Sequence, residues 1–171
     1  MRDQHALIEK LNRVRGELLA VLESVPPEKW QKPPANGGWS AAEVIAHLTM
    51  VETAVVDAAT KKIQQEPRQL PFWKRIHFPP KLSEYRFKKV KTPIPIDPVL
   101  LADKQSMLDR YQGTRRRTLA FLDAHRQLDL GRWRWRHPFF GSLDGYTWFR
   151  TLYHHEIRHT KQLRGIVESI R

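Results

Sequence analysis

Apolar residues recur at intervals of three and four over four separate stretches of this chain. In the first stretch these positions are Leu7, Leu11, Val14, Leu18, Val21/Leu22 and Val25. This spacing matches the 3.6-residue period of an amphipathic helix. It predicts a helix over residues 4–25, which Pro26-Pro27 would end because proline lacks the backbone donor that a helix interior needs.

The second stretch begins with a sequence that favours a helix start. Ser40 is followed three residues later by Glu43, the spacing of a capping box in which each side chain binds the other residue's backbone. The predicted helix covers residues 40–64. Its apolar face is expected to hold Val44, His47, Val51, Ala54/Val55 and Ala58. A histidine on such a face needs a partner, because burying an unpaired polar group costs free energy.

Two more helices are predicted in the C-terminal half, over residues 98–125 and 144–170. Asp97-Pro98 offers an N-cap acceptor followed by a proline at the first helical position. On a wheel at 100° per residue, one face of the last helix spans an arc of about 80°. It contains Trp148, Leu152, His155, His159, Gln162, Ile166 and Ile170.

These four stretches predict an all-α fold, a four-helix bundle of antiparallel helices with little or no sheet, in a single domain over residues 1–171. A long Pro-rich connection joins the second and third helices, since seven of the twelve prolines lie between Pro67 and Pro98. We expect its aromatic residues to pack along the bundle, with its lysines and arginines facing water. These aromatics are Phe72, Trp73, Phe78, Tyr85 and Phe87.

Arginine and tryptophan alternate over residues 132–136, just before His137-Pro138. The alternation is compatible with a short strand, with an extended lip or with a surface on which bases stack. We favour burial of one tryptophan face under a loop.

The net charge of +12 is concentrated in two segments. Residues 61–91 carry ten Lys/Arg against two acidic residues, and residues 110–136 carry eight Arg against two. Such surfaces attract nucleic acid, anionic lipid or anionic small molecules. Nucleic acid is disfavoured as a partner, because no known nucleic-acid-binding module accompanies the charge.

The composition also limits the cellular compartments and the types of chemistry that we expect for the protein. The chain has no cysteine, which excludes disulfides, thiolate ligands and a cysteine nucleophile. No apolar run approaches the roughly 18 residues that span a membrane, and the N-terminus does not resemble a signal peptide. A cytoplasmic location is therefore expected. The sequence allows a homodimer and does not set the oligomeric state.

Histidines cluster near the C-terminus at positions 154, 155 and 159. His155 and His159 are one helical turn apart, so both imidazoles lie on one helix face, whereas His154 points about 100° away. Three inward imidazoles (His47, His155 and His159) without a common partner would each cost desolvation, which favours a shared metal ion. Taken singly, each histidine is more simply explained as a core or surface residue.

The segment His155-Glu156-Ile157-Arg158-His159 also has the H-E-x-x-H spacing of zinc proteases. The extended protease motif requires glycine at 162 and histidine at 165. This chain has Gln162 and Gly165 there, and Glu168 is the only acidic residue after His159. We therefore reject Glu156 as a protease base.

Two motifs resemble the DinB/YfiT-like proteins, metal-binding four-helix bundles of the DinB superfamily. The first runs from Gly38-Trp39-Ser40 to His47-Leu48. The second contains His137-Pro138-Phe139-Phe140-Gly141, then Trp148, then His155-x-x-x-His159-x-x-Gln162-Leu163. The resemblance spans nearly the whole chain, with Thr160-Lys161 in place of the family's frequent Arg-Gly.

The resemblance implies that His47, His155 and His159 ligate one divalent ion. Zn²⁺ or Ni²⁺ suits three imidazoles best, and Mn²⁺ and Fe²⁺ are also compatible. A water or a thiolate at the open coordination position would make the protein a hydrolase or a thiol-dependent transferase acting on a small molecule, with a low-molecular-weight thiol as co-substrate. Two alternatives stay open: a metal-binding stress or sensor protein without turnover, and a basic bundle associated with nucleic acid.

Overall fold

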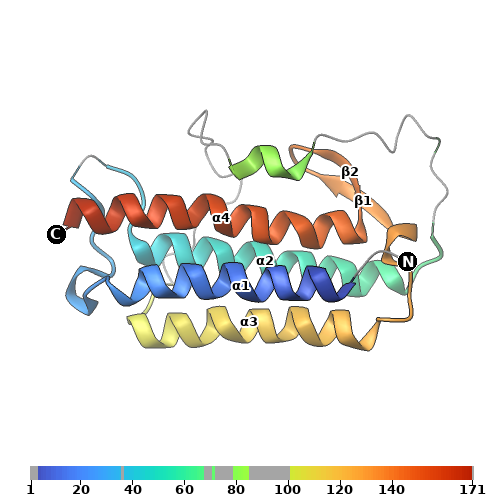
Figure 1. The fold of residues 1–171 in the computed structure, drawn as a ribbon, viewed down its shortest axis with the longest axis horizontal. Coiled ribbons are helices and arrows are strands. Elements are labelled where there is room, and N and C mark those ends of the chain that lie inside the picture. Colours follow the sequence, from blue (N-terminus) through green and yellow to red (C-terminus); the bar gives the residue numbers. More distant parts are fainter. Residues whose placement is uncertain (1–3, 36, 68–70, 72–78, 85–100, 171) are drawn as a thin grey trace.

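Four long helices build the protein, and the expected four-helix bundle is confirmed (Figure 1). The computed structural model describes residues 4–35, 37–67, 71, 79–84 and 101–170. The helices are α1 (Gln4–Glu23), α2 (Ala41–Ile63), α3 (Lys104–Ala124) and α4 (Gly145–Ile170). Short 3₁₀ helices lie between them: η1 (Pro27–Lys29), η3 (Pro80–Glu84) and η5 (Leu130–Arg132). The aromatics predicted to pack in the Pro-rich connection lie outside the described residues.

The helices do not simply alternate in direction. α1 and α2 run in opposite directions, but α2 and α3 run in the same direction, and α4 runs parallel to α1 (Figure 1). The expectation of a wholly antiparallel bundle is therefore wrong for α2 and α3. The physical reason is the long connection: a crossover long enough to return to the starting end permits parallel neighbours, which a short turn forbids.

Caps explain where α2 and α3 begin. The predicted capping box is present, with the Glu43 amide donating to Ser40 Oγ at 3.2 Å and the Ser40 amide donating to Glu43 Oε2 at 2.8 Å. The predicted start of the third helix at residue 98 is wrong, because residues 101–103 are not helical. Asp103 is the N-cap instead, and its carboxylate accepts a hydrogen bond from the Ser106 amide at 2.9 Å.

A two-stranded antiparallel hairpin precedes α4. It consists of β1 (Arg134–His137) and β2 (Gly141–Asp144), with Trp135 paired with Leu143. Trp135 stacks on Trp148 of α4, with ring centroids 5.3 Å apart and planes 9° apart. The alternating Arg–Trp segment thus includes most of a short strand. One tryptophan face is covered, as predicted, but the covering element is helix α4 and not a loop.

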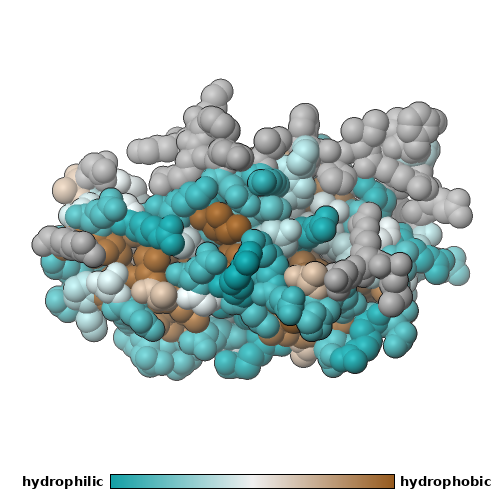
Figure 2. All heavy atoms as spheres, in the orientation of Figure 1, coloured by the Kyte–Doolittle hydropathy of each residue, from teal (hydrophilic) through white to brown (hydrophobic). Residues whose placement is uncertain are grey.

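Two apolar clusters fill the two halves of the bundle interior. One is built around Trp30, Ile45, Tyr111 and Leu163, and the other around Leu11, Leu122, Leu143 and Phe149. The described face of the molecule shown in Figure 2 is largely hydrophilic, with separate apolar patches among the hydrophilic residues. No helix among the described residues is long and apolar enough to cross a membrane.

Candidate metal centre

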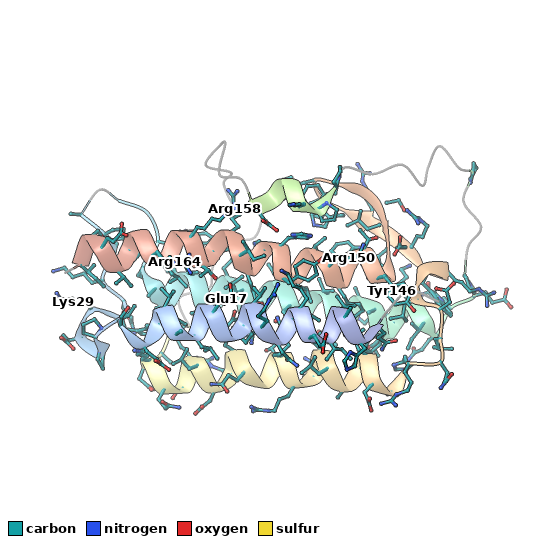
Figure 3. All side chains as sticks on the ribbon, in the orientation of Figure 1. Glu17, Lys29, Tyr146, Arg150, Arg158 and Arg164 are labelled. Carbon is teal, nitrogen blue, oxygen red and sulfur yellow. The ribbon has the colours of Figure 1, made fainter. Side chains whose placement is uncertain are left out.

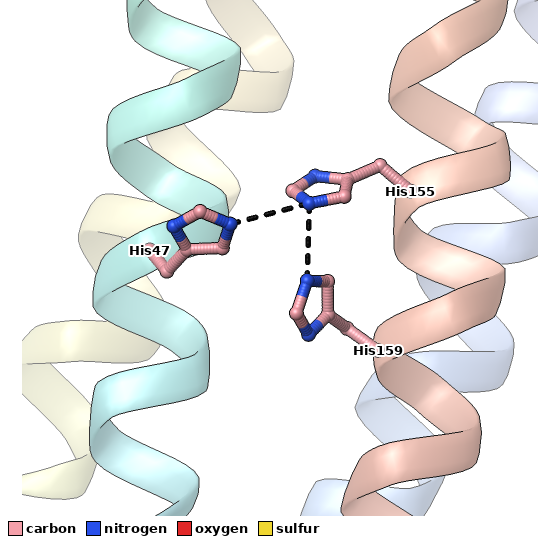
Figure 4. A group of neighbouring side chains, drawn as sticks. All are labelled: His47, His155 and His159. Atoms are coloured by element: carbon pink, nitrogen blue, oxygen red, sulfur yellow. Dashed lines mark hydrogen bonds between the residues drawn. The ribbon is translucent and has the colours of Figure 1, made fainter. Parts of the chain in front are cut away.

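The structure brings His47, His155 and His159 together halfway along the bundle, between α2 and α4 (Figure 4). His155 Nε2 lies 3.2 Å from His47 Nε2 and 3.0 Å from His159 Nε2. One ligand nitrogen from each residue lies within 4.8 Å of the others. Among the described residues, no further histidine, aspartate or glutamate joins this group.

The spacing of these nitrogens fits a shared divalent ion. Zinc–nitrogen bonds of 2.0–2.1 Å at tetrahedral angles would separate ligand nitrogens by about 3.4 Å. The two Nε2–Nε2 distances, 3.2 and 3.0 Å, are slightly shorter than this. An imidazole nitrogen carries either one proton or one lone pair, so His155 Nε2 cannot make good hydrogen bonds to both neighbours at once. A common cation satisfies all three nitrogens.

The surroundings keep two of these imidazoles, those of His47 and His155, unprotonated, the form that binds metals. Burial lowers the pKa of His47 from 6.5 to about 4. Burial also lowers the pKa of His155 well below its ordinary value, with further contributions from His159, His47 and Arg158. Both shifts follow from the cost of placing positive charge in a poorly solvated site.

Gln162 supports His159 in the orientation that a metal ligand needs. His159 is buried, and its Nδ1 lies 3.0 Å from Gln162 Oε1, one turn further along α4. A carbonyl oxygen only accepts, so His159 Nδ1 carries the proton and donates it. The Nε2 lone pair of the neutral ring is then directed toward His155, in the tautomer that second-shell hydrogen bonds favour in metal sites.

The position of His47 differs from the prediction in one respect. The predicted apolar face of the second helix matches the observed one in part: Val44 and Val55 are buried as predicted, but Ala54 is exposed, and the buried Leu48, Glu52 and Ala59 lie outside the predicted face. His47 therefore lies at the edge of the buried face and is half-buried, as is His155. The three histidines form a site on the flank of the bundle, with one side less covered than a core site would be.

Aromatic rings and a positive charge lie beside this site. The half-buried Trp39, just before α2, has its ring centroid 5.0 Å from that of His47 and is stacked parallel to His159 at 6.1 Å. Arg158 lies on α4 between the two ligand histidines in sequence (Figure 3). An indole face therefore lies beside the rings of the site, and the positive charge of Arg158 is near enough to contribute to the lowered pKa of His155.

His154 stays apart from the three histidines, as the helix wheel predicts. Its Nδ1 pairs with Glu84 of η3, which packs against α4. Lys161 Nζ donates to the Glu84 backbone carbonyl at 3.3 Å. His154 therefore helps to anchor the described part of the long connection.

His137 is a residue near the site for which the sequence predicted no role. Its ring centroid lies 4.7 Å from that of Trp148 and 4.6 Å from that of Phe140. Its Nδ1 accepts the backbone amides of Phe139 at 3.1 Å and Phe140 at 3.3 Å, so the proton of the neutral ring sits on Nε2. Burial lowers the pKa of His137 to about 4, and His137 also contributes to the lowered pKa of His155. The sequence feature that could have indicated a role for His137 is its position directly before a proline at a turn.

Glu156 has a structural environment that supports its rejection as a protease base. It is buried and lies in a cluster of charged side chains with Arg15, Glu52 and Arg115, one from each helix. Sequence reasoning missed this cluster. The sequence feature that could have revealed the cluster is a charged residue at an otherwise apolar position of each helix.

Comparisons with known proteins agree with the family resemblance seen in the sequence. A family model described as the DinB superfamily matches residues 10–163. The chain is also similar to the uncharacterized protein YuaE of Bacillus subtilis (strain 168), with 27% identity over 160 residues, covering 93% of this chain and 96% of the relative. No solved structure matches the chain.

Proposed function

The chain belongs to the DinB superfamily, and on that premise we propose that it is a metal-dependent enzyme with a divalent ion held by His47, His155 and His159. The observation that supports this most is the convergence of three imidazole nitrogens without a fourth ligand among the described residues. Structural zinc sites usually have four protein ligands, whereas catalytic sites have three and an open position. Zn²⁺ and Ni²⁺ are the ions that nitrogen ligands of this kind favour.

The protein's own residues prepare the site for such an ion. Burial keeps His47 and His155 neutral near pH 7. Gln162 holds the proton of His159 on Nδ1 and leaves Nε2 available. Trp39 shields two of the rings on one side. A divalent ion in such a site supplies a Lewis acid with an open coordination position, which can activate a water or a thiol.

A small molecule is the substrate class that we propose, in a hydrolysis or a thiol-dependent transfer. The half-buried state of His47 and His155 supports access from the flank of the bundle. Arg158 beside the site favours a substrate or a thiol that carries negative charge. The name of the similar Bacillus protein assigns no activity that could narrow this further.

Metal content and turnover together test the proposal. Wild type, His47→Ala, His155→Ala and His154→Ala would be loaded with Zn²⁺ or Ni²⁺, desalted and measured by elemental analysis. We expect about one ion per chain in wild type and in His154→Ala, and little in the two ligand variants. His154→Ala is the matched control, because it removes a neighbouring imidazole that pairs with Glu84 instead.

Turnover would be measured on the same four proteins. The probes are ester and phosphoester chromogens for hydrolysis, and an aryl halide with a series of small thiols for transfer. Activity that requires the ion and is lost in His47→Ala supports the enzyme. A bound ion without turnover of any probe would favour the metal-binding stress or sensor protein instead, and loss of metal from His154→Ala alone would contradict the ligand assignment.

A further inference from the structure

Each helix carries one charged residue at a position that the helix otherwise fills with core side chains. Four buried positions in each helix follow the spacing four, three, four, and the second of them is charged. The sets are 11-15-18-22 in α1, 48-52-55-59 in α2, 111-115-118-122 in α3 and 152-156-159-163 in α4. The charged members are Arg15, Glu52, Arg115 and Glu156, and we call them the central ion network.

Each carboxylate of the network is held by both arginines. Arg15 Nε donates to Glu156 Oε1 at 2.6 Å, and Arg15 Nη2 donates to Glu52 Oε2 at 2.5 Å. Arg115 Nε donates to Glu52 Oε1 at 2.7 Å, and Arg115 Nη2 donates to Glu156 Oε2 at 2.9 Å. The formal charges cancel, and all four side chains are at most 6% exposed.

Neighbouring groups complete the hydrogen bonds of the network. The Tyr111 hydroxyl donates to Glu156 Oε1, and the Thr118 hydroxyl donates to Glu52 Oε1 at 2.7 Å. Arg15 Nη1 donates to the Tyr111 carbonyl at 2.7 Å, and the Arg15 guanidinium lies 3.4 Å from the Tyr111 ring centroid. Burial by itself would raise the pKa of Glu52, but Arg115 and Arg15 outweigh it and lower that pKa. Glu52 is therefore held in its ionised form, and hydrogen bonds from both arginines satisfy each carboxylate of the network.

The network is adjacent to the metal centre along both helices that supply histidines. Glu156 directly follows His155, so it lies about 100° around α4 and faces the bundle axis while His155 faces α2. Glu52 is five residues beyond His47, about 140° around α2. The same two arginines hold both carboxylates, so the rotation of α2 and the rotation of α4 depend on one set of contacts.

An apolar core alone would specify these rotations less strictly. Apolar burial is non-directional, whereas arginine–carboxylate pairs impose planar, directed hydrogen bonds. Metal ligands must meet within a few tenths of an ångström, and a slip of one helical turn would move His155 by about 5.4 Å. Buried ion networks of this kind are better attested as devices for register than as sources of stability.

We propose that Arg15, Glu52, Arg115 and Glu156 are positioning residues for the metal centre, which hold α2 and α4 in the rotation and register that bring His47 onto His155 and His159. This proposal rests on the metal site proposed above. It assigns the network a role in metal affinity that is separate from its contribution to folding.

The decisive variant replaces the whole network with apolar residues of similar size: Arg15→Met, Glu52→Leu, Arg115→Met and Glu156→Leu together. Such replacements of buried ion networks are often neutral or stabilising. We expect a cooperatively folding protein whose affinity for Zn²⁺ or Ni²⁺, measured by competition with a chelator, falls by about 5- to 150-fold, the usual range of coupling between sites. The absorption spectrum of the Co²⁺-loaded variant should also change, because that spectrum reports ligand geometry.

An exposed ion pair between two of the same helices is the matched control. Arg117 Nη2 lies 2.6 Å from Asp57 Oδ1, and both side chains are about half exposed. The double variant Arg117→Met, Asp57→Leu removes an α2–α3 pair outside the network, and it should leave metal affinity and the Co²⁺ spectrum unchanged.

The outcomes separate the two proposals. A folded quadruple variant with wild-type affinity overturns the positioning role while the metal site stands. A wild-type protein that binds no divalent ion overturns both. If the quadruple variant does not fold, Tyr111→Phe and Thr118→Val decide, since each removes one hydroxyl from the network; lower affinity in both supports positioning, and unchanged affinity in both overturns it.

Discussion

Hydrogen bonds with individual groups set which nitrogen carries the proton in two histidines, one in the metal centre and one near it. Gln162 and the backbone amides of Phe139 and Phe140 act in opposite ways on two rings. Gln162 accepts from Nδ1 of His159 and leaves its Nε2 unprotonated. The two amides donate to Nδ1 of His137 and leave the proton of its neutral ring on Nε2. At the scale of the residue, one ring is prepared as a ligand and the other as a donor.

The role of Gln162 gives a first prediction. Gln162→Leu removes the acceptor for His159 Nδ1 and should lower the affinity for Zn²⁺ about 10- to 100-fold, as outer-shell changes do in other metal sites. Gln162→Glu keeps an acceptor at the same distance and should retain affinity. Competition with a chelating dye measures both, with the exposed Gln112→Leu as the control. Equal affinities for Gln162→Leu and wild type would contradict this role.

A second prediction concerns His137 and pH. Burial lowers its pKa to about 4 from 6.5, so between these values the unfolded chain binds a proton that the folded chain does not. The stability of the folded state should therefore fall as the pH decreases from 6.5 to 4, and His137→Gln should lose part of this fall. Between pH 7 and pH 4, the free energy of unfolding of wild type should fall by about 1–3 kcal/mol more than that of His137→Gln.

Urea unfolding with chelator present measures this difference. The comparison cancels the titration of the histidines that His137 does not influence; His155, whose pKa His137 helps to lower, contributes to the measured difference together with His137. Identical pH dependence in wild type and His137→Gln would show that His137 is protonated equally in the folded and unfolded states.

At the scale of the element, the ends of helices decide where the ligands lie. The capping box at Ser40 and Glu43 sets the start of α2, and therefore the direction in which the His47 side chain projects from the helix. The start of α4 is also capped, because the Thr147 amide donates to Asp144 Oδ1 at 3.0 Å, and it is closely packed. A Cβ on Gly145 would lie 2.7 Å from the backbone carbonyl oxygen of Leu130 in η5.

The third prediction contrasts two glycines of α4. Gly145→Ala should destabilise the protein by about 1–3 kcal/mol, the usual cost of overpacking, because the nearest contact is backbone and cannot rotate away. Gly165→Ala should stabilise it by up to about 1 kcal/mol, because nothing lies within 4 Å of its Cβ and alanine favours the helix. Thermal and urea unfolding measure both, and equal effects of the same sign would contradict the packing described for η5.

At the scale of the whole molecule, a bound ion would act as a cross-link between α2 and α4. These helices are separated along the chain by α3 and the long connection, so the ion would join distant parts of the sequence. Ligands that bind only the folded state stabilise it in proportion to the logarithm of their concentration over Kd. The metal centre is therefore coupled to the stability of the bundle.

The fourth prediction follows from this coupling. At a free Zn²⁺ concentration of 100 times Kd, the stabilisation is about 2.7 kcal/mol, which raises the Tm of a chain of this size by roughly 5–10 °C. Circular dichroism melting with and without chelator would show this shift in wild type and in His154→Ala. His155→Ala should melt at one temperature in both conditions, and a full shift in that variant would indicate that the ion binds elsewhere.

The sequence by itself determined those features of the fold and of the site that depend on neighbouring residues along the chain. Helical periodicity located all four helices, and the spacing of Ser40 and Glu43 located a cap. One turn between His155 and His159 placed both on one face and separated His154 from them. These predictions succeed because helix geometry relates residues three and four apart without reference to the rest of the fold.

The tertiary structure alone decided those features of the fold and of the site that depend on partners distant in the chain. Arg15, Glu52, Arg115 and Glu156 interrupt apolar stripes, but their sequence positions do not say which carboxylate each arginine meets. The predicted face of α2 omitted Glu52 because a charged residue is counted as polar until its partners are known. The parallel run of α2 and α3 likewise depends on packing, since periodicity fixes the face of a helix and says nothing of its direction beside a neighbour.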